Sequence, residues 1–259
     1  MIQLTRIASF FFSCYAFLVF LFLLILVFPL AVIASLFGKV KGGNFIYRLC
    51  RLWSSSLFLL TCIRTRLLYE TAHDASRSYV FVFNHISYLD IPALLVAIRG
   101  QHFRVLGKAE LAKIPVFGFI YRSAAVLVQR NVPVHRAKSV LTLKSVLNKS
   151  ISVVISPEGT FNTTGQPLKD FYDGAFRIAI ETRTPVKPIL FPDNFDRLNY
   201  HSVFSLRPGL MRAVFLEEIS TAGLAAEDIP ALKLKVYSIM QEGLQRYRAS
   251  WIQTGERKR

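Results

Sequence analysis

Acidic residues are scarce in this 259-residue chain, where 16 Asp and Glu stand against 32 Lys and Arg and leave a formal net charge of +16. Charged residues are also few overall, 19% against 53% hydrophobic, which excludes a disordered chain. The basic residues are scattered and form no nucleic-acid recognition motif, so we expect no nucleic-acid partner. Positive charge on an apolar chain points instead to an anionic membrane surface, where each nearby Lys or Arg contributes about 1 kcal/mol.

Cysteine is scarce too, with Cys14, Cys50 and Cys62 all in the first quarter of the chain. An odd number at these spacings excludes a disulfide scaffold and matches no zinc motif, so we expect three buried thiols. No cluster of metal-ligating residues is visible elsewhere in the sequence, and no metal is expected.

Charge is absent altogether between Arg6 and Lys39, where Phe and Leu dominate. A membrane span needs about 20 apolar residues, and the part before Pro29 is long enough. A second uncharged run, residues 52–63, is too short to cross and suits the interface. Residues 1–68 are therefore predicted to be a membrane-embedded helical segment.

Two alternatives to a spanning helix stay open for the first run. A cleaved signal peptide has weak support from Ala31 and Ala34, but its apolar region would be too long. A hairpin in the inner leaflet is the other alternative. The positive residues that follow the run place the bulk of the chain in the cytoplasm in either membrane arrangement; they are Lys39, Lys41, Arg48 and Arg51.

Short apolar runs alternate with helical periods over residues 69–259, which predicts an α/β domain with a mixed sheet flanked by helices. Strands are expected at 78–83, 103–107, 125–129, 151–155, 186–190 and 211–216. Helices are expected at about 88–98, 135–148, 172–182 and 227–250.

The segment FNHISYLD follows the strand predicted to end at Phe83, where α/β proteins place reactive groups. His85 could take a proton from a hydroxyl while Asp90 fixes its tautomer, if the chain turns before a helix beginning near Ser87. Such a base contributes about 10²–10⁴ in rate. The structural alternative is a capping box formed by Ser87 and Asp90, with Asn84 as a turn residue.

The segment ISVVISPEGT is a second strand that runs into a loop. Glu158, Gly159 and Thr160 there offer a carboxylate, an open backbone and a hydroxyl, and such a loop can bind an anion or a developing oxyanion. An ordinary turn explains the same residues.

The ordered pair NHxxxxD and PEGT resembles the glycerolipid acyltransferase family, specifically the bacterial 1-acylglycerol-3-phosphate (lysophosphatidate) acyltransferases. The resemblance covers roughly residues 75–190. Its further matches are Lys108–Leu111, Ile114–Gly118, the strand that ends at Arg130, and Thr184–Pro188.

This resemblance implies a general base at His85 oriented by Asp90, with Asn84 and the loop residues Glu158, Gly159 and Thr160 holding the acceptor. Lys108 and Arg130 match positions associated with the phosphate and the reacting thioester. The implied donor is acyl-CoA or acyl carrier protein, with no other cofactor, and the implied product is phosphatidate. The implied location is the inner membrane, with the active site on its cytoplasmic face.

Two positions depart from the family pattern. Phe161 stands where the third block usually has a phosphate-binding Arg, and Ala124 stands where the second block commonly has Gly. Lys169 or Arg177 could supply the missing charge. Two alternatives therefore stay open: an acyltransferase for another lysolipid, of lyso-ornithine or lysophosphocholine type, and an inactive membrane protein that only binds lipid.

Overall fold

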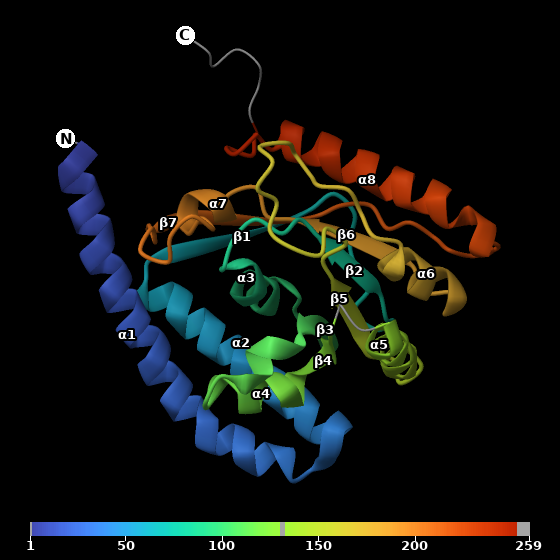
Figure 1. Ribbon diagram of the computed structural model, residues 1–259, viewed down its shortest axis with the longest axis horizontal. Helices are drawn as coiled ribbons and strands as arrows, with labels where there is room; N and C mark the ends of the chain where they lie inside the picture. Colours follow the sequence, from blue (N-terminus) through green and yellow to red (C-terminus); the bar gives the residue numbers. More distant parts are fainter. Residues whose placement is uncertain (1, 130–132, 253–259) are drawn as a thin grey trace.

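A seven-stranded mixed sheet forms the centre of the molecule in the computed structural model, which describes residues 2–129 and 133–252 (Figure 1). The strand order is β1-β7-β6-β2-β5-β3-β4. The five strands from β6 to β4 are parallel, while β7 is antiparallel to β6 and parallel to β1. The strands are β1 Ile63–Tyr69, β2 Val80–Phe83, β3 Phe103–Lys108, β4 Ala125–Val128, β5 Ser152–Ile155, β6 Val186–Leu190 and β7 Gly209–Phe215.

Helices cover both faces of this sheet, so the central strands are buried on both sides. In β2 the two valines join the cluster on one face, and Phe81 and Phe83 join the cluster on the other. The first face carries α5 Pro133–Leu147, α6 Gly174–Glu181 and α8 Ile229–Arg246; the second carries α2 Gly43–Leu60 and α3 Asp90–Ala97.

The N-terminal helix α1, Ile2–Ser35, runs along the outside of α2 and is joined to it by a π-helical turn, Gly38–Gly42. Its residues Ile7–Ser35 are long and apolar enough to cross a membrane by length and composition. The remaining short elements are 3-10 turns at Ala109–Lys113 and Ala226–Asp228, α4 Phe117–Ala124 and α7 Asn194–Arg197.

The predicted mixed α/β fold is confirmed, and each predicted strand and helix of the α/β part is present within a few residues. Strand β1 was not predicted, because its sequence IRTRLLY carries two arginines on the exposed side of an edge strand. The predicted boundary between residues 68 and 69 falls inside β1. The prediction of three buried thiols is wrong, because Cys14 and Cys50 are half-buried and Cys62, in the turn before β1, is exposed.

Candidate active site

The carboxyl ends of parallel strands carry the predicted site residues. His85 follows β2, Glu158 follows the neighbouring strand β5, and Lys108 ends β3, the next strand along. The carboxyl ends of adjacent parallel strands lie at the same edge of the sheet, so the topology brings these residues to one edge. Arg130 comes after β4 and lies outside the described residues.

A hydrogen bond joins His85 to Asp90, with His85 Nδ1 2.8 Å from Asp90 Oδ2. The Asp90 side chain is fully buried, whereas that of His85 keeps 24% exposure. Asp90 Oδ2 also accepts the backbone N–H groups of Ile86 (2.8 Å) and Ser87 (2.9 Å). An ionised carboxylate can only accept hydrogen bonds, so the His85 nitrogen that contacts Asp90 must be the donor. Nδ1 therefore carries the proton, and Nε2 is free to act as the base.

The turn between β2 and α3 explains how residues five positions apart meet. Residues 84–89 are not helical, and Asp90 is the first residue of α3. The capping interpretation is correct in part, because Asp90 accepts the Ser87 N–H, and Ser87 Oγ accepts the N–H of Leu89 at 3.0 Å. One carboxylate therefore begins the helix and orients the imidazole.

Two of the predicted acceptor-binding residues, Asn84 and Glu158, are buried and hold backbone segments in place. Asn84 is 1% exposed and pairs with the backbone of Phe191, accepting its N–H at 2.8 Å. Glu158 is also 1% exposed and accepts the N–H groups of His85 (2.7 Å) and Lys169 (2.9 Å). Both side chains hold loops in place, and each Glu158 oxygen accepts one backbone N–H.

Burial raises the pKa of Glu158 to about 7, against the two backbone N–H groups that lower it. The unfolded chain releases this proton near the ordinary value of 4.5, while the folded chain holds it to about pH 7. The stability of the folded state therefore falls as pH rises through this window, by roughly 3 kcal/mol in total.

We expect Glu158→Gln to remove this dependence. Thermal unfolding of both proteins in detergent should show a wild-type melting temperature that falls more steeply between pH 5 and 7.5 than that of the variant. Parallel curves for the two proteins would contradict the raised pKa.

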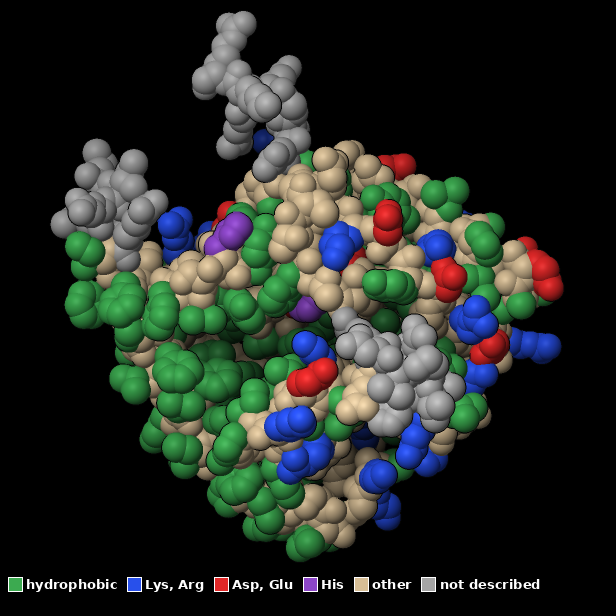
Figure 2. Space-filling view, viewed as in Figure 1, with side chains coloured by type: hydrophobic (Ala, Val, Ile, Leu, Met, Phe, Trp, Pro, Cys, Tyr) green, Lys and Arg blue, Asp and Glu red, His purple; other side chains and the backbone are tan. Residues whose placement is uncertain are grey.

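The loop after Glu158 brings a hydroxyl, a cation and an aromatic ring to the base. Gly159 is buried and has φ +74°, a left-handed conformation that favours glycine. Thr160 is exposed, and its hydroxyl accepts a hydrogen bond from Lys169 Nζ at 2.7 Å. The Phe161 ring lies 4.4 Å from the His85 ring, centroid to centroid. The hollow on this face of the molecule has apolar side chains on one side and Lys and Arg side chains near its other side (Figure 2).

Three contacts at this edge were not predicted. Asn194, at the start of α7, is fully buried and donates from Nδ2 to Asp90 Oδ1 at 2.8 Å. Its position just beyond the carboxyl end of β6 is a signal that could have identified it. Tyr88 packs edge-on against Phe161 at 5.0 Å, and Tyr200 lies 6.3 Å from the same ring. Aromatic rings thus surround one side of the base.

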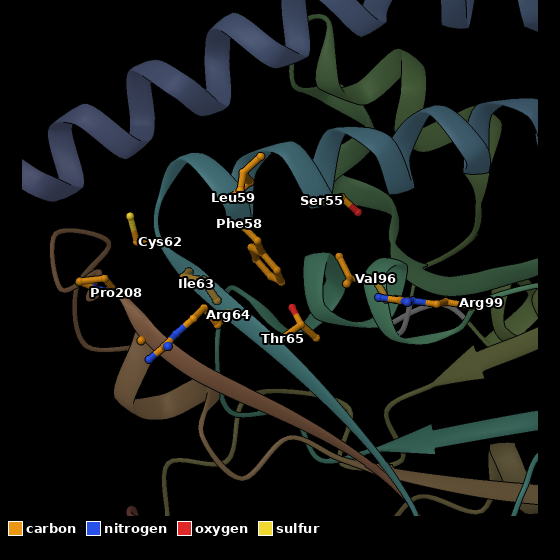
Figure 3. Close-up of a pocket in the computed structure, with 11 residues that line it drawn as sticks. Ser55, Phe58, Leu59, Cys62, Ile63, Arg64, Thr65, Val96, Arg99 and Pro208 are labelled. Atoms are coloured by element: carbon orange, nitrogen blue, oxygen red, sulfur yellow. The ribbon is translucent and has the colours of Figure 1, made fainter.

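One cavity lies elsewhere in the molecule, and none of the predicted site residues line it (Figure 3). It has a volume of about 810 Å³ and lies between the end of α2, the end of α3 and the starts of β1 and β7. Phe58 and Val96 point into it, and Arg99 approaches from one side. Within residues 2–129 and 133–252, no group of three or more His, Cys, Asp or Glu side chains could hold a metal ion.

Comparison with known proteins agrees with this geometry. Residues 66–191 match the model of the Acyltransferase family, in agreement with the resemblance that the NHxxxxD and PEGT motifs carry. Among its relatives is 1-acyl-sn-glycerol-3-phosphate acyltransferase beta of Homo sapiens, 28% identical over 162 residues that cover 61% of this chain and 56% of that protein. The alpha enzyme of Mus musculus is 28% identical over 209 residues, covering 78% and 72%.

The fold is that of a solved structure, the 1-acyl-sn-glycerophosphate (LPA) acyltransferase from Thermotoga maritima. The TM-score is 0.73 at 20% identity, over 98% of this chain and 100% of that chain. The similarity includes the N-terminal helices, because it extends over almost the whole chain.

Proposed function

We propose that this protein transfers a fatty acyl group from acyl-CoA or acyl carrier protein to the sn-2 hydroxyl of 1-acylglycerol-3-phosphate, giving phosphatidate. The observation that carries the proposal is the His85–Asp90 pair, 2.8 Å apart at the carboxyl end of β2, inside the acyltransferase domain. The names of the human and mouse relatives, both 1-acyl-sn-glycerol-3-phosphate acyltransferases, support the acceptor.

The reaction needs one base and no covalent enzyme intermediate. His85 Nε2 takes the proton of the acceptor hydroxyl, whose oxygen attacks the thioester carbonyl carbon. The new C–O bond forms, the C–S bond breaks, and the departing thiolate takes the proton back from His85. Asp90 stabilises the imidazolium between these steps. Lys108, exposed at the end of β3, offers a positive charge to the developing oxyanion or to the phosphates of the donor.

The contacts of α1 support insertion into one leaflet rather than a free spanning helix. Near its start, Ser13 Oγ accepts the Leu206 N–H at 3.0 Å. Near its end, Phe28 packs edge-on against Phe119 at 5.7 Å. A helix held against the domain along this length presents only its outer side to lipid. The excess of positive residues after it supports the cytoplasmic face of the inner membrane.

Acyl transfer by the detergent-purified protein tests the proposal. Lysophosphatidate, a lyso-ornithine lipid and lysophosphatidylcholine would each be offered with acyl-CoA and with acyl carrier protein as donors. Product from lysophosphatidate is expected. Product only from another lysolipid would overturn the acceptor and keep the mechanism, whereas no product with any pair would support an inactive lipid-binding protein.

Another lysolipid is a second candidate acceptor because of Phe161. Its ring fills the space against His85, where the family pattern has a cation for the phosphate. An acceptor without a terminal phosphate does not need that cation for binding.

A further inference from the structure

The position beside the base that could hold an anion is occupied by an aromatic ring. Phe161 contacts His85 and packs against Tyr88, so neither a guanidinium nor an ammonium can stand in its place. If the acceptor carries a negative headgroup next to its reacting hydroxyl, another residue of the same loop must meet that charge.

Lys169, further along the same loop, places a positive charge next to Thr160 and thus beside Phe161 in the chain. Its ammonium donates to Thr160 Oγ1 at 2.7 Å, directly beside Phe161. An ammonium has three N–H donors, and this bond uses one of them. Among the described residues the Lys169 ammonium makes no ion pair with a carboxylate. The Glu158 carboxylate interacts with it electrostatically, but its hydrogen bond is to the Lys169 backbone N–H.

The backbone of Lys169 is tied to the backbone of the base through one carboxylate. Glu158 accepts the N–H of His85 with Oε1 and that of Lys169 with Oε2. The loop is closed at two further points, where Asn162 N donates to His85 O (2.8 Å) and Tyr172 N donates to Pro157 O (2.9 Å). The backbone of Lys169 is therefore held at a fixed offset from that of His85, and the ammonium is held by its hydrogen bond to Thr160, as a site for two neighbouring groups of one molecule requires.

We propose that Lys169, together with the Thr160 hydroxyl, binds the anionic headgroup of the acceptor while His85 binds its hydroxyl. This rests on the proposed function. In lysophosphatidate the headgroup is the phosphate on the carbon next to the reacting hydroxyl, and in a lyso-ornithine lipid it is a carboxylate. An arginine would bind the headgroup with two parallel N–H donors, whereas the Lys169 ammonium supplies a single compact positive charge.

Steady-state kinetics of Lys169→Gln tests this assignment. A hydrogen bond to a charged group contributes about 1.5–3 kcal/mol, so KM for the anionic acceptor should rise about 10- to 150-fold with kcat changed only a few-fold. Lys169→Arg should stay within a few-fold of wild type. KM for an uncharged 1-acylglycerol should not change.

The matched control is Lys149→Gln, which removes an exposed positive charge in the turn before β5, at the other end of that strand, and leaves the loop intact. Equal effects of the two substitutions, or an equal rise in KM for 1-acylglycerol, would overturn the assignment. Comparison of lysophosphatidate with the lyso-ornithine lipid shows whether the headgroup is a phosphate or a carboxylate, since only the true acceptor should depend strongly on Lys169.

A binding measurement keeps the assignment separate from the reaction. In a His85→Ala background, lysophosphatidate or the lyso-ornithine lipid should bind at least 10-fold more weakly when Lys169→Gln is added. Unchanged affinity for both lipids would refute the role of Lys169, even if the protein transfers acyl groups. If Lys169→Gln weakens binding but the wild-type protein shows no turnover, only the proposed reaction would be refuted.

Discussion

His85→Ala is expected to lower kcat/KM for acyl transfer by about 10²–10⁴, the usual contribution of a general base. The fold should survive, because the imidazole lies in a loop after β2 and makes one side-chain hydrogen bond, to Asp90. The measurements are acyl transfer and the melting temperature of the same detergent-purified protein.

His102→Ala is a suitable control for this experiment. His102 lies just before β3, at the amino ends of the parallel strands, and only its backbone carbonyl bonds to Ser152. The control should keep nearly full activity. A His85→Ala protein that unfolds, rather than one that folds and fails to turn over, would show that His85 serves the turn more than the reaction.

The His85–Asp90 contact could be predicted from the sequence because it is local. The five-residue spacing works only if the chain turns before a helix, and the Ser87–Asp90 capping pattern predicted that turn. The same reasoning located the strand ends, since buried parallel strands read as continuous apolar runs. Residues that act within one loop were thus within reach of sequence analysis.

The contacts that cross between loops could not be predicted in the same way. The hydrogen bond from the His85 N–H to Glu158 depends on the strand order, which places β5 beside β2. Asn194 was missed because its link to Asp90 depends on β6 lying beside β2. Periodicity and motifs contain no information on which strand neighbours which.

Phe161 shows how a departure from a family pattern gains meaning from structure. In the sequence, Phe161 shows only that the usual arginine is absent at this position. In the fold it is an aromatic ring against the base, beside a hydroxyl and an ammonium that arrive from Thr160 and Lys169. The loop has therefore moved its positive charge rather than lost it, which keeps an anionic acceptor compatible with the site.

Asp90→Asn should remove most of the activity while leaving the protein folded. The carboxylate is fully buried and accepts from four groups, three at Oδ2 and one at Oδ1. An asparagine keeps its carbonyl oxygen toward the three donors, because its NH₂ group there would face the backbone N–H groups of Ile86 and Ser87.

The NH₂ group of this asparagine then faces Asn194, and that residue can adapt. Asn194 Oδ1 is buried and has no hydrogen-bond partner among the described residues. A flip of the Asn194 amide turns this oxygen toward position 90, where it accepts from the new NH₂ group. The substitution therefore costs little packing and removes the negative charge beside the imidazole.

Without that charge the imidazolium formed during proton transfer loses its counter-ion, so kcat should fall by about 10²–10⁴. Asp90→Ala is the informative contrast, since it leaves four buried donors unpaired at about 1–3 kcal/mol for each group. Its melting temperature should fall far below that of Asp90→Asn. Near wild-type turnover in a folded Asp90→Asn protein would mean that Asp90 serves only to begin helix α3. A large loss of turnover at a nearly unchanged melting temperature would mean that its negative charge supports His85 as the base.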